Sequence, residues 1–414
     1  MSNLTSAHIS QQRLWDRHES LARIGATPGG GVNRQALSKE DIAACRQLID
    51  WGNAIGLQAS RDEAGNIFLR LEGTDSQAAP VISGSHLDSQ PTGGKYDGAY
   101  GVLAALEACQ AIVESGVHPV RPIDVVAWMN EEGSRFAPGM MGASVFGGAR
   151  SLDQITSIRD QRGISVGDAL RDAQQAMADI PQRDLGQPTF AYVEAHIEQG
   201  PLLERENKAI GVVSGIQGKR TFMVSIEGEA SHAGTSLRSE RRDALLAAMR
   251  IIQALTTHIH DEHDVVKFTI GRFDVTPNAP SVVPSGVRFS IDLRHPDSNV
   301  LTSLGDAIAG ICETHAAPCH AQVDELSSAM SLEFPQDMRQ RIRDAADLLD
   351  ITRMEILSAA GHDARYLHPV CPSAMLFIPC HEGITHNESE SITAADAAAG
   401  ARVLTEVIMS LAGS

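Results

Sequence analysis

Residues 123–132 read I-D-V-V-A-W-M-N-E-E, an apolar run of strand length that ends in two adjacent glutamates. Three further apolar runs have the same form and end at or just before a histidine: Pro80–Ser85 before His86, Thr189–Ala195 before His196, and Ala374–Pro379 ahead of a loop that holds His386. Because open α/β sheets bind their ligands at the carboxyl ends of strands, these runs predict four strands with polar residues gathered at one edge.

Longer segments of helical period alternate with these strands. The clearest is Gly98–Ser115, with Asp97 at its start and Gly116 as a stop. Strands alternating with helices indicate an α/β domain built from βαβ units, with a mixed, mostly parallel sheet flanked by helices. Leu152–Pro188 is helical in pattern and has no clear purpose in this domain.

The segment from about Gly218 to Glu325 has a different order of elements. It predicts, in turn, a strand, a helix, two strands, a helix and a strand at Thr221–Ile226, Arg241–His258, Val265–Phe273, Val287–Leu293, Val300–His315 and His320–Val323. This βαββαβ order is the ferredoxin-like pattern. We expect a catalytic domain at 1–216 and 331–414 that is interrupted by an inserted ferredoxin-like lid and dimerisation domain at 217–330, with connections in Val212–Gly218 and Glu325–Pro335.

The composition excludes several classes of function. The chain has 414 residues, 34 Lys and Arg, and 52 Asp and Glu, so its formal net charge is −18. A net negative charge argues against nucleic acid and anionic membranes as partners. The N-terminal residues have no apolar signal-peptide core, and the six cysteines form no C-x-x-C pair. We therefore expect a cytoplasmic protein with reduced thiols.

The residues at the strand ends have the chemistry of a metal site. Imidazole and carboxylate groups together suit zinc, manganese, cobalt or nickel, and two ions that share one carboxylate need about five protein ligands. Three histidines and two carboxylates would meet that need. Since Glu131 and Glu132 are adjacent and point in different directions, one can coordinate a cation while the other acts as a general base. Asp88, two residues after His86, is placed to fix the tautomer of that imidazole.

Five motifs resemble those of the hydantoinase/carbamoylase family of dinuclear metal amidohydrolases, a branch of the aminoacylase and peptidase superfamily. They are S-G-S-H-L-D-S at 83–89, G-G-K-Y-D-G at 93–98, N-E-E-G-S-R-F at 130–136, E-A-H-I-E-Q-G-P at 194–201 and T-H-N-E at 385–388. The resemblance implies that His86 and His196 hold one metal ion, that Glu132 and His386 hold the other, that Asp97 bridges them, and that Glu131 is the general base.

The same resemblance points to substrate-binding residues. His232 is similar to an oxyanion-stabilising histidine of the family, and Asn278 and Arg294 to its substrate-binding pair. Gln199, Gly361 and His362 match further substrate-lining positions. In a chain of net charge −18, a fixed guanidinium such as that of Arg294 would be needed to bind an anionic substrate. By analogy with the family, the inserted domain would form a homodimer in which lid residues reach the neighbouring subunit.

The implied activity is hydrolysis of the ureido group of N-carbamoyl-L-amino acids, with two zinc ions as the first expectation and manganese, cobalt or nickel as alternatives. An allantoate amidohydrolase or a β-ureidopropionase would use the same mechanism. An aminoacylase or dipeptidase is a further alternative, but those enzymes usually carry a carboxylate at the position of His196. A non-catalytic, metal-stabilised binding protein would have no need of Glu131 beside its metal ligands.

Overall fold

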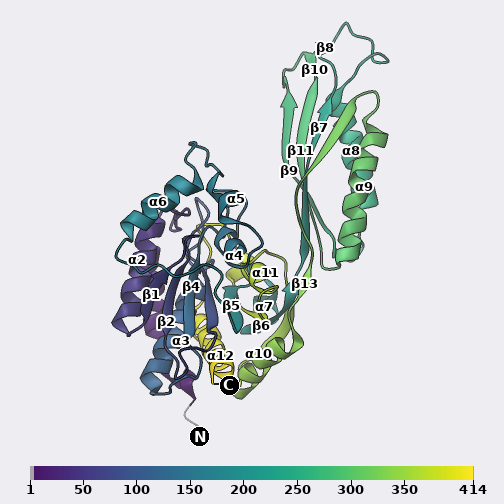
Figure 1. Cartoon of the computed structure of the whole chain (residues 1–414). Coiled ribbons are helices and arrows are strands. Elements are labelled where there is room, and N and C mark those ends of the chain that lie inside the picture. The colour runs from purple at the N-terminus through teal and green to yellow at the C-terminus, as the bar shows by residue number, and fades with distance from the viewer. Residues whose placement is uncertain (1–3, 414) are drawn as a thin grey trace. The chain divides into compact units, whose positions relative to one another are not determined.

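The structure, a computed structural model, describes residues 4–413. It divides into two compact units (Figure 1): the first runs to Ser214 and resumes at Phe334, and the second is Gly215–Glu333. The expected boundaries at 216/217 and 330/331 lie within three residues of this division. None of the described helices combines the length and the apolar character that a bilayer span requires.

The first unit is built on a mixed β-sheet. Its strand order is β1 (Gln58–Arg61), β2 (Ile67–Leu71), β4 (Ile123–Trp128), β3 (Val81–His86), β5 (Ala191–Ile197), β15 (Ser373–Ile378), β6 (Ile210–Ile216) and β13 (Leu332–Glu333), with β14 (Arg353–Ser358) paired to β6. The four central strands, β4, β3, β5 and β15, are parallel, whereas β1, β2, β6 and β13 are antiparallel to their neighbours. The four central strands therefore end at one edge of the sheet, where the sequence predicted that polar residues gather.

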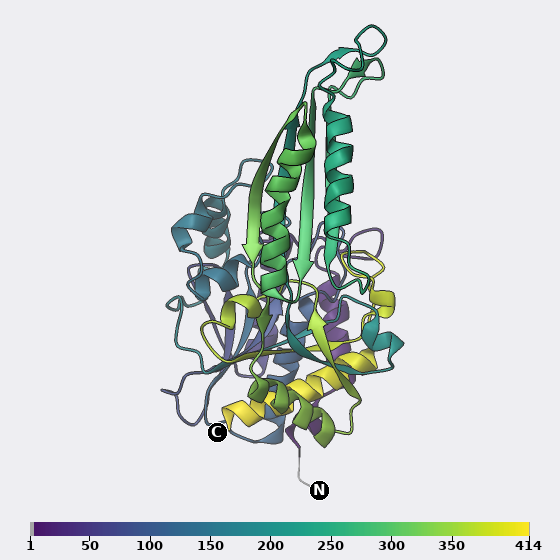
Figure 2. The same ribbon diagram turned by 90° about the vertical axis from the view of Figure 1, so that its right-hand side faces the viewer.

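Helices cover both faces of this sheet (Figures 1 and 2). On one face α3 (Ala99–Ser115) and α12 (Ala394–Ala412) pack against the central strands, with η1 (Thr5–His8), α1 (Gln11–Ala22) and α10 (Gln336–Leu348) beside them. Short helices α4 (Met141–Phe146) and α11 (Ala364–Leu367) contact strands β4, β5 and β15. The remaining helices are α2 (Lys39–Ala54), which contacts β1 and β2, α5 (Leu152–Thr156), α6 (Val166–Ala176), α7 (Leu202–Arg205) and η2 (His381–Gly383). The predicted α/β fold is confirmed.

Strand β5 shows how the sequence assigns its two faces. Ala191, Val193, Ala195 and Ile197 alternate along the strand and join the apolar core that includes α3 and α12. The intervening residues, Tyr192, Glu194 and His196, are also fully buried but polar, and they face the other side of the sheet. A strand buried on both faces that carries polar side chains on one of them must hold those side chains in hydrogen bonds or ion pairs. His196 thereby lies inside the fold, not on its surface.

The second unit has the predicted βαββαβ order. Strands β7 (Gly218–Glu227), β9 (Lys267–Thr276), β11 (Gly286–His295) and β12 (His320–Ala329) form an antiparallel sheet in the order β12-β7-β11-β9. Helices α8 (Ala244–His258) and α9 (Ser298–Ala316) pack on one face of it around Phe222, Val224 and Phe289. Each helix begins at an aspartate whose side chain accepts two backbone N–H bonds. A ribbon of β8 (Ser231–His232) and β10 (Val282–Val283) completes the unit.

Two parts of the chain differ from the expected organisation. The segment Val212–Gly218, expected as a connection, is mostly strand, because β6 runs to Ile216 and β7 begins at Gly218. The single residue Gln217 therefore separates a strand of one sheet from a strand of the other. Leu152–Pro188 contains the helices α5 and α6, in agreement with its helical pattern.

Candidate metal centre and active site

The candidate residues of the first unit meet at the carboxyl edge of its four parallel strands. His86 is the last residue of β3, His196 lies near the end of β5, and Glu131 and Glu132 follow β4. His386 is on the loop after β15, and Asp97 comes just before α3. Residues separated by up to 300 positions in the sequence are therefore brought into one cluster by the parallel strand order.

Two groups of candidate ligands share Asp97. His86, Asp97 and His196 form the first group, and Asp97, Glu132 and His386 form the second; within each group the ligand atoms lie within 4.8 Å of one another. Asp97 Oδ1 is 3.2 Å from His196 Nε2 and 3.9 Å from His86 Nε2, whereas Asp97 Oδ2 is 3.2 Å from His386 Nε2. His386 Nε2 is in turn 3.4 Å from Glu132 Oε2. One oxygen of Asp97 thus faces each group.

These distances fit a pair of metal ions. Ligand atoms bound at about 2.0–2.1 Å in a tetrahedral site lie roughly 3.3 Å from one another. The Nδ1 atoms of His86 and His196 are each 2.9 Å from a backbone carbonyl, of Asp88 and Ile197, to which they can donate a proton. With that proton kept on Nδ1, each ring would offer its Nε2 to a metal ion, the form in which imidazole binds one.

The structure corrects the predicted part played by the Asp88 side chain. His86 Nδ1 bonds to the backbone carbonyl of Asp88, and its distance to the Asp88 carboxylate is longer, 3.7 Å. That carboxylate instead accepts hydrogen bonds from the backbone N–H groups of Glu131 and Glu132, at 3.1 and 3.2 Å. The carbonyl, two residues beyond His86 in the same turn, is already placed to fix the tautomer, so the carboxylate is available for the neighbouring loop.

A glycine is required between Asp97 and α3. Gly98 has φ of +65°, a conformation that side chains disfavour, and a Cβ atom at this position would lie 2.3 Å from a ring carbon of His86. The helix therefore begins without a side-chain cap, and Asp97 points into the cluster. The Asp97 side chain therefore belongs to the cluster and does not cap α3.

Charge in the cluster is arranged around Asp97. Burial acts to raise the pKa of Asp97, but hydrogen bonds with His196 and His386 outweigh it and hold this pKa well below its usual range. The bond to Asp97 raises the pKa of His386 to about 9, and the same carboxylate overcomes burial to raise the pKa of His196 to about 9. Burial lowers the pKa of His86 to about 4. Asp97 is therefore an anion that attracts positive charge to both groups.

Glu131 has the surroundings of a base. Its Oε2 lies 3.5 Å from His86 Nε2, yet Glu131 belongs to neither group of candidate ligands. Burial, followed by the negative charges of Asp363 and Glu132, raises the pKa of Glu131 well above its usual range. A raised pKa makes the carboxylate a stronger proton acceptor.

The backbone around Glu131 is closely held. The carbonyl of Glu131 accepts a hydrogen bond from the N–H of Met140 at 2.7 Å, and the carbonyl of Asn130 accepts one from Met141 at 3.1 Å. Asn130 itself has φ of +54°. A non-glycine residue in this region is strained, and such strain is concentrated at functional sites. The backbone that carries both glutamates of the motif N-E-E-G is therefore held by hydrogen bonds.

Gln199 contacts the shared carboxylate. Its Nε2 donates to Asp97 Oδ2 at 3.0 Å, while its Oε1 is buried and has no hydrogen-bond partner among the described residues. Gln199 and His386 both have positive φ, of 58° and 52°. An unpaired buried acceptor beside the cluster is the feature expected of a residue that receives an N–H group from a substrate.

His362 and Gly361 lie on the loop between β14 and α11. The His362 ring is buried, its Nε2 is 2.9 Å from Ser358 Oγ, and its centroid is 4.6 Å from that of His196. His362 thus supports His196 from the side, whereas Gly361 is exposed and lies near the methyl group of Met140. Their predicted contact with substrate stays a prediction.

His232, in the second unit, is held as a hydrogen-bond donor. Its Nδ1 accepts bonds from the backbone N–H groups of Gly234 and Thr235 at 3.0 and 3.2 Å. A nitrogen that accepts carries no proton, so the neutral ring has its proton on Nε2. His232 is exposed. It therefore presents an N–H group to whatever contacts this surface, as an oxyanion-stabilising residue must.

The second unit separates Arg294 from the other two substrate residues predicted there. Asn278 follows β9, whose last residue, Thr276, pairs with Gly286 at the start of β11. The loop of Asn278 also meets the loop of His232, through a hydrogen bond from Ala233 N–H to the Ser281 carbonyl.

Arg294 lies eight residues along β11 from Gly286, or roughly 26 Å at about 3.3 Å per residue. Its guanidinium donates to the Asp292 carboxylate at 2.8 and 3.1 Å. A substrate the size of an amino acid does not span the length of β11. The structure therefore does not bring Arg294 together with His232 and Asn278 within one unit.

Some residues of the cluster were not anticipated from the sequence. Gln90 donates from its backbone and its side chain to the Glu132 carboxylate, at 3.2 and 2.7 Å. Glu390 and Thr385 contact the loop of Asp97. The only signal for Glu390 and Thr385 was their position in or beside the motif T-H-N-E.

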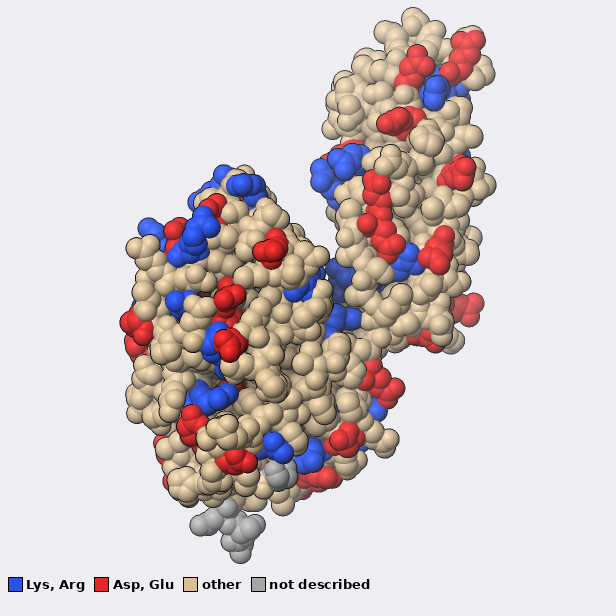
Figure 3. Space-filling view, in the orientation of Figure 1, with Lys and Arg blue, Asp and Glu red and all other residues tan. Residues whose placement is uncertain are grey.

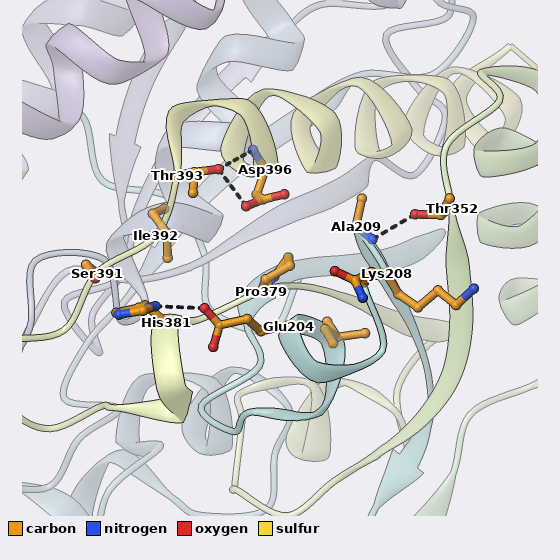
Figure 4. Close-up of a pocket in the computed structure, with 12 residues that line it drawn as sticks. Glu204, Lys208, Ala209, Thr352, Pro379, His381, Ser391, Ile392, Thr393 and Asp396 are labelled. Carbon is orange, nitrogen blue, oxygen red and sulfur yellow. Dashed lines mark hydrogen bonds and ion pairs between the residues drawn. The ribbon is translucent and has the colours of Figure 1, made fainter.

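A cavity of 440 Å³ lies elsewhere in the first unit (Figure 4). Its lining includes Glu204, Lys208, Thr352, His381 and Asp396. Glu204 and His381 form an ion pair at 2.7 Å across it. None of the candidate metal ligands lines this cavity, so it is separate from the metal cluster.

Comparisons with known proteins agree with this geometry. Residues 82–410 match the peptidase family M20/M25/M40. The chain is 37% identical over 409 residues to an N-carbamoyl-L-amino-acid amidohydrolase of Rhizobium meliloti, covering 98% of this chain and 97% of that protein. It is 36% identical to an allantoate amidohydrolase of Bacillus subtilis (96% and 97% covered). A crystal structure of an amidase of the hydantoinase/carbamoylase family from Burkholderia multivorans superposes with a TM-score of 0.89 at 40% identity, covering 98% of each chain.

Proposed function

The chain belongs to the peptidase family M20/M25/M40, and from that premise we propose that it hydrolyses the ureido group of N-carbamoyl-L-amino acids. Water and the carbamoyl compound yield the amino acid, carbon dioxide and ammonia. The observation that carries the proposal is Asp97, whose two oxygens face separate groups of ligands while Glu131 lies beside them and outside both. The similarity to carbamoyl-amino-acid and allantoate amidohydrolases supports a linear carbon–nitrogen bond other than a peptide bond as the target.

The donor set fits two divalent cations. His86 and His196 would hold one, Glu132 and His386 the other, and Asp97 would bridge them. The imidazole and carboxylate groups suit zinc first, with manganese, cobalt or nickel as alternatives. When bound, such a pair of cations acidifies water and polarises the ureido carbonyl, a resonance-stabilised and weak electrophile.

Glu131 is the general base. Its carboxylate accepts the proton of the attacking water, because burial, and then the charges of Asp363 and Glu132, make its charged form costly. The same group then returns this proton to the leaving nitrogen. Gln199, with its unpaired buried Oε1, orients an N–H group of the substrate beside Asp97.

Residues of the second unit would complete substrate binding. His232 donates from Nε2 to the oxyanion, where one such donor is worth on the order of 3 kcal/mol. Arg294 binds the carboxylate and Asn278 a polar group of the substrate. Because roughly 26 Å of β11 separate Arg294 from the end that carries Asn278, we infer that one site takes them from different subunits of a homodimer.

Two related substrates are retained as alternatives. Allantoate and carbamoyl-β-alanine both carry a ureido group and a carboxylate, and the identity to an allantoate amidohydrolase is close to that for the carbamoyl-amino-acid enzyme. An aminoacylase or dipeptidase is disfavoured by His196, where those enzymes usually have a carboxylate. We also propose a cytoplasmic location, in keeping with six cysteines that form no disulfide.

Release of ammonia tests the proposal. The purified chain, supplied with zinc or with manganese, is assayed on N-carbamoyl-L-amino acids, carbamoyl-β-alanine, allantoate and N-acetyl-L-amino acids, the last by release of acetate. We expect the highest kcat/KM on a carbamoyl-L-amino acid. Preference for allantoate would favour the allantoate amidohydrolase, and turnover of the acetyl compounds alone would refute the ureido assignment.

A further inference from the structure

Glu390 is a buried carboxylate whose contacts all lie on the loops of the candidate ligands. It is 3% exposed and lies four residues after His386. Its Oε1 accepts hydrogen bonds from the backbone N–H groups of Tyr96 and Asp97 at 2.9 and 3.1 Å. The loop that ends in the shared aspartate is therefore fixed from the loop that carries His386.

Thr385, next to His386, forms a second tie between the same loops. Its hydroxyl is 3.0 Å from Glu390 Oε2 and 3.3 Å from Asp97 Oδ2. A hydroxyl has one proton, so it serves chiefly the nearer acceptor, Glu390. Thr385 Oγ1 also lies 3.5 Å from the amide of Gln199, which donates to Asp97. Both oxygens of Glu390 thus accept hydrogen bonds: Oε1 from the backbone of Tyr96 and Asp97, and Oε2 from the Thr385 hydroxyl.

The surroundings of Glu390 are shaped for a carboxylate. A Cβ atom on Gly94 would lie 1.9 Å from Glu390 Cδ and 2.0 Å from its Oε1. A glycine at this position is therefore needed for the carboxylate to reach the backbone of Tyr96 and Asp97. The loop G-G-K-Y-D-G leaves room for Glu390 by lacking a side chain where the two segments touch.

We propose that Glu390 is a positioning residue, which with Thr385 holds Asp97 and His386 at the spacing that a second cation requires. The inference rests on the proposed function. Two of the three ligands in the group Asp97, Glu132 and His386 lie on segments that Glu390 joins, against one of three in the group His86, Asp97 and His196. Loss of Glu390 therefore weakens the group of Asp97, Glu132 and His386 more than the group of His86, Asp97 and His196.

The test is a zinc titration of the metal-free full-length chain. Isothermal calorimetry, in competition with a chelator of known affinity, gives the affinities of the two binding steps for wild type, E390Q and E382Q. Glu382 is an exposed carboxylate on the same loop and serves as the matched control. We expect E390Q to weaken one step about 10- to 100-fold, the usual effect of removing a hydrogen-bond partner of a ligand, and the other step by less than a third of that factor. E382Q should match wild type.

A second measurement reports on the backbone and needs neither bound metal nor catalytic activity. The rate of amide hydrogen exchange in a peptide covering residues 95–98 reports how well the N–H groups of Tyr96 and Asp97, which donate hydrogen bonds to Glu390, are protected. We expect faster exchange in E390Q, since a neutral amide is a weaker acceptor than a carboxylate. A larger loss in E390A than in E390Q would agree with positioning through hydrogen bonds.

The outcomes separate this inference from the proposed function. A wild-type chain that does not bind two zinc ions overturns the function. A wild-type chain that binds two, with E390Q unchanged or with both steps weakened equally, overturns the positioning role alone. Should E390Q fail to fold, Thr385→Val, which removes a single hydroxyl, decides the matter: two zinc affinities equal to those of wild type overturn the inference, and a selective loss supports it.

Discussion

His18 gives the chain a pH-dependent stability whose size can be worked out. It lies on α1, is 1% exposed, and is surrounded by the rings of Trp15, Tyr96 and Tyr100 at centroid distances of 6.3, 5.4 and 6.1 Å. Neither ring nitrogen has a hydrogen-bond partner among the described residues. Burial, with a smaller contribution from the charge of Arg34, lowers the pKa of His18 from 6.5 to about 3.

The direction of the pH effect on stability follows from comparing His18 in the folded and the unfolded chain. The unfolded chain binds a proton at His18 near pH 6.5, while the folded chain resists it until about pH 3. The contribution of neutral His18 to the free energy of unfolding is therefore fully present above pH 6.5. It is lost as the pH falls below that value, at about 1.4 kcal/mol per pH unit. Between pH 7 and pH 5 this one group lowers the free energy of unfolding by about 2 kcal/mol.

The perturbation is His18→Phe, which keeps an aromatic ring but cannot be protonated. Trp15, Trp51 and Trp128 are the three tryptophans and all lie in the first unit, so fluorescence during urea unfolding reports that unit alone. The difference in unfolding free energy between wild type and H18F should shift by about 2 kcal/mol in favour of the variant from pH 7 to pH 5. A variant at the exposed His118, H118Q, controls for loss of an imidazole. A difference that stays constant with pH would refute the reasoning.

Three further outcomes follow from the contacts described. Glu131→Gln should lower kcat by about 10³-fold or more while zinc content, measured by mass spectrometry, stays at the wild-type level; unchanged turnover would remove Glu131 as the base. Arg294→Ala should raise KM about 10- to 100-fold for N-carbamoyl amino acids but little for their carboxamides, and an equal effect on both would relocate the carboxylate site. Glu107→Ala should lower the unfolding free energy of the first unit by about 3 kcal/mol in the same fluorescence assay, since Glu107 is fully buried and paired with Arg13 and Arg17. A loss below 1 kcal/mol would contradict this.

The part of the site that the sequence predicts depends on strand ends. A strand buried on both faces must be apolar for most of its length, so a histidine or glutamate where the apolar run stops is visible as an exception. His86, Glu131 and His196 are found in this way. The parallel order of β3, β4, β5 and β15 then brings these ends to one edge of the sheet, which is why the fold and the metal cluster could be predicted together.

The sequence pattern does not reveal strand β6, and the reason is physical. Only Gln217 separates it from β7, so the chain passes from one sheet to the other without a loop. An apolar run of strand type there looks like part of a single continuous element, and the segment Val212–Gly218, expected as a connection, includes most of β6. Where two sheets share one extended segment, the periodicity of the sequence has no break to mark their boundary.

The sequence could predict which side chains gather as candidate ligands but not what holds them in place. The Asp88 carboxylate, on the loop after β3, accepts hydrogen bonds from the backbone N–H groups of Glu131 and Glu132. The Glu390 carboxylate, on the loop after β15, likewise accepts hydrogen bonds from the backbone N–H groups of Tyr96 and Asp97. In both cases a buried carboxylate from one ligand loop binds two successive N–H groups of another, and N–H groups are present at every residue except proline, so no sequence pattern identifies the pair.

Charge-assisted bonds of this kind are stronger than those between neutral groups, and each pair joins loops from different strands. The candidate ligands are therefore coupled through the backbone as well as through Asp97, which both groups contain. Movement of one of these loops is opposed by its partner before any metal ion binds. This is the property that the zinc titration of E390Q and the exchange of residues 95–98 would measure.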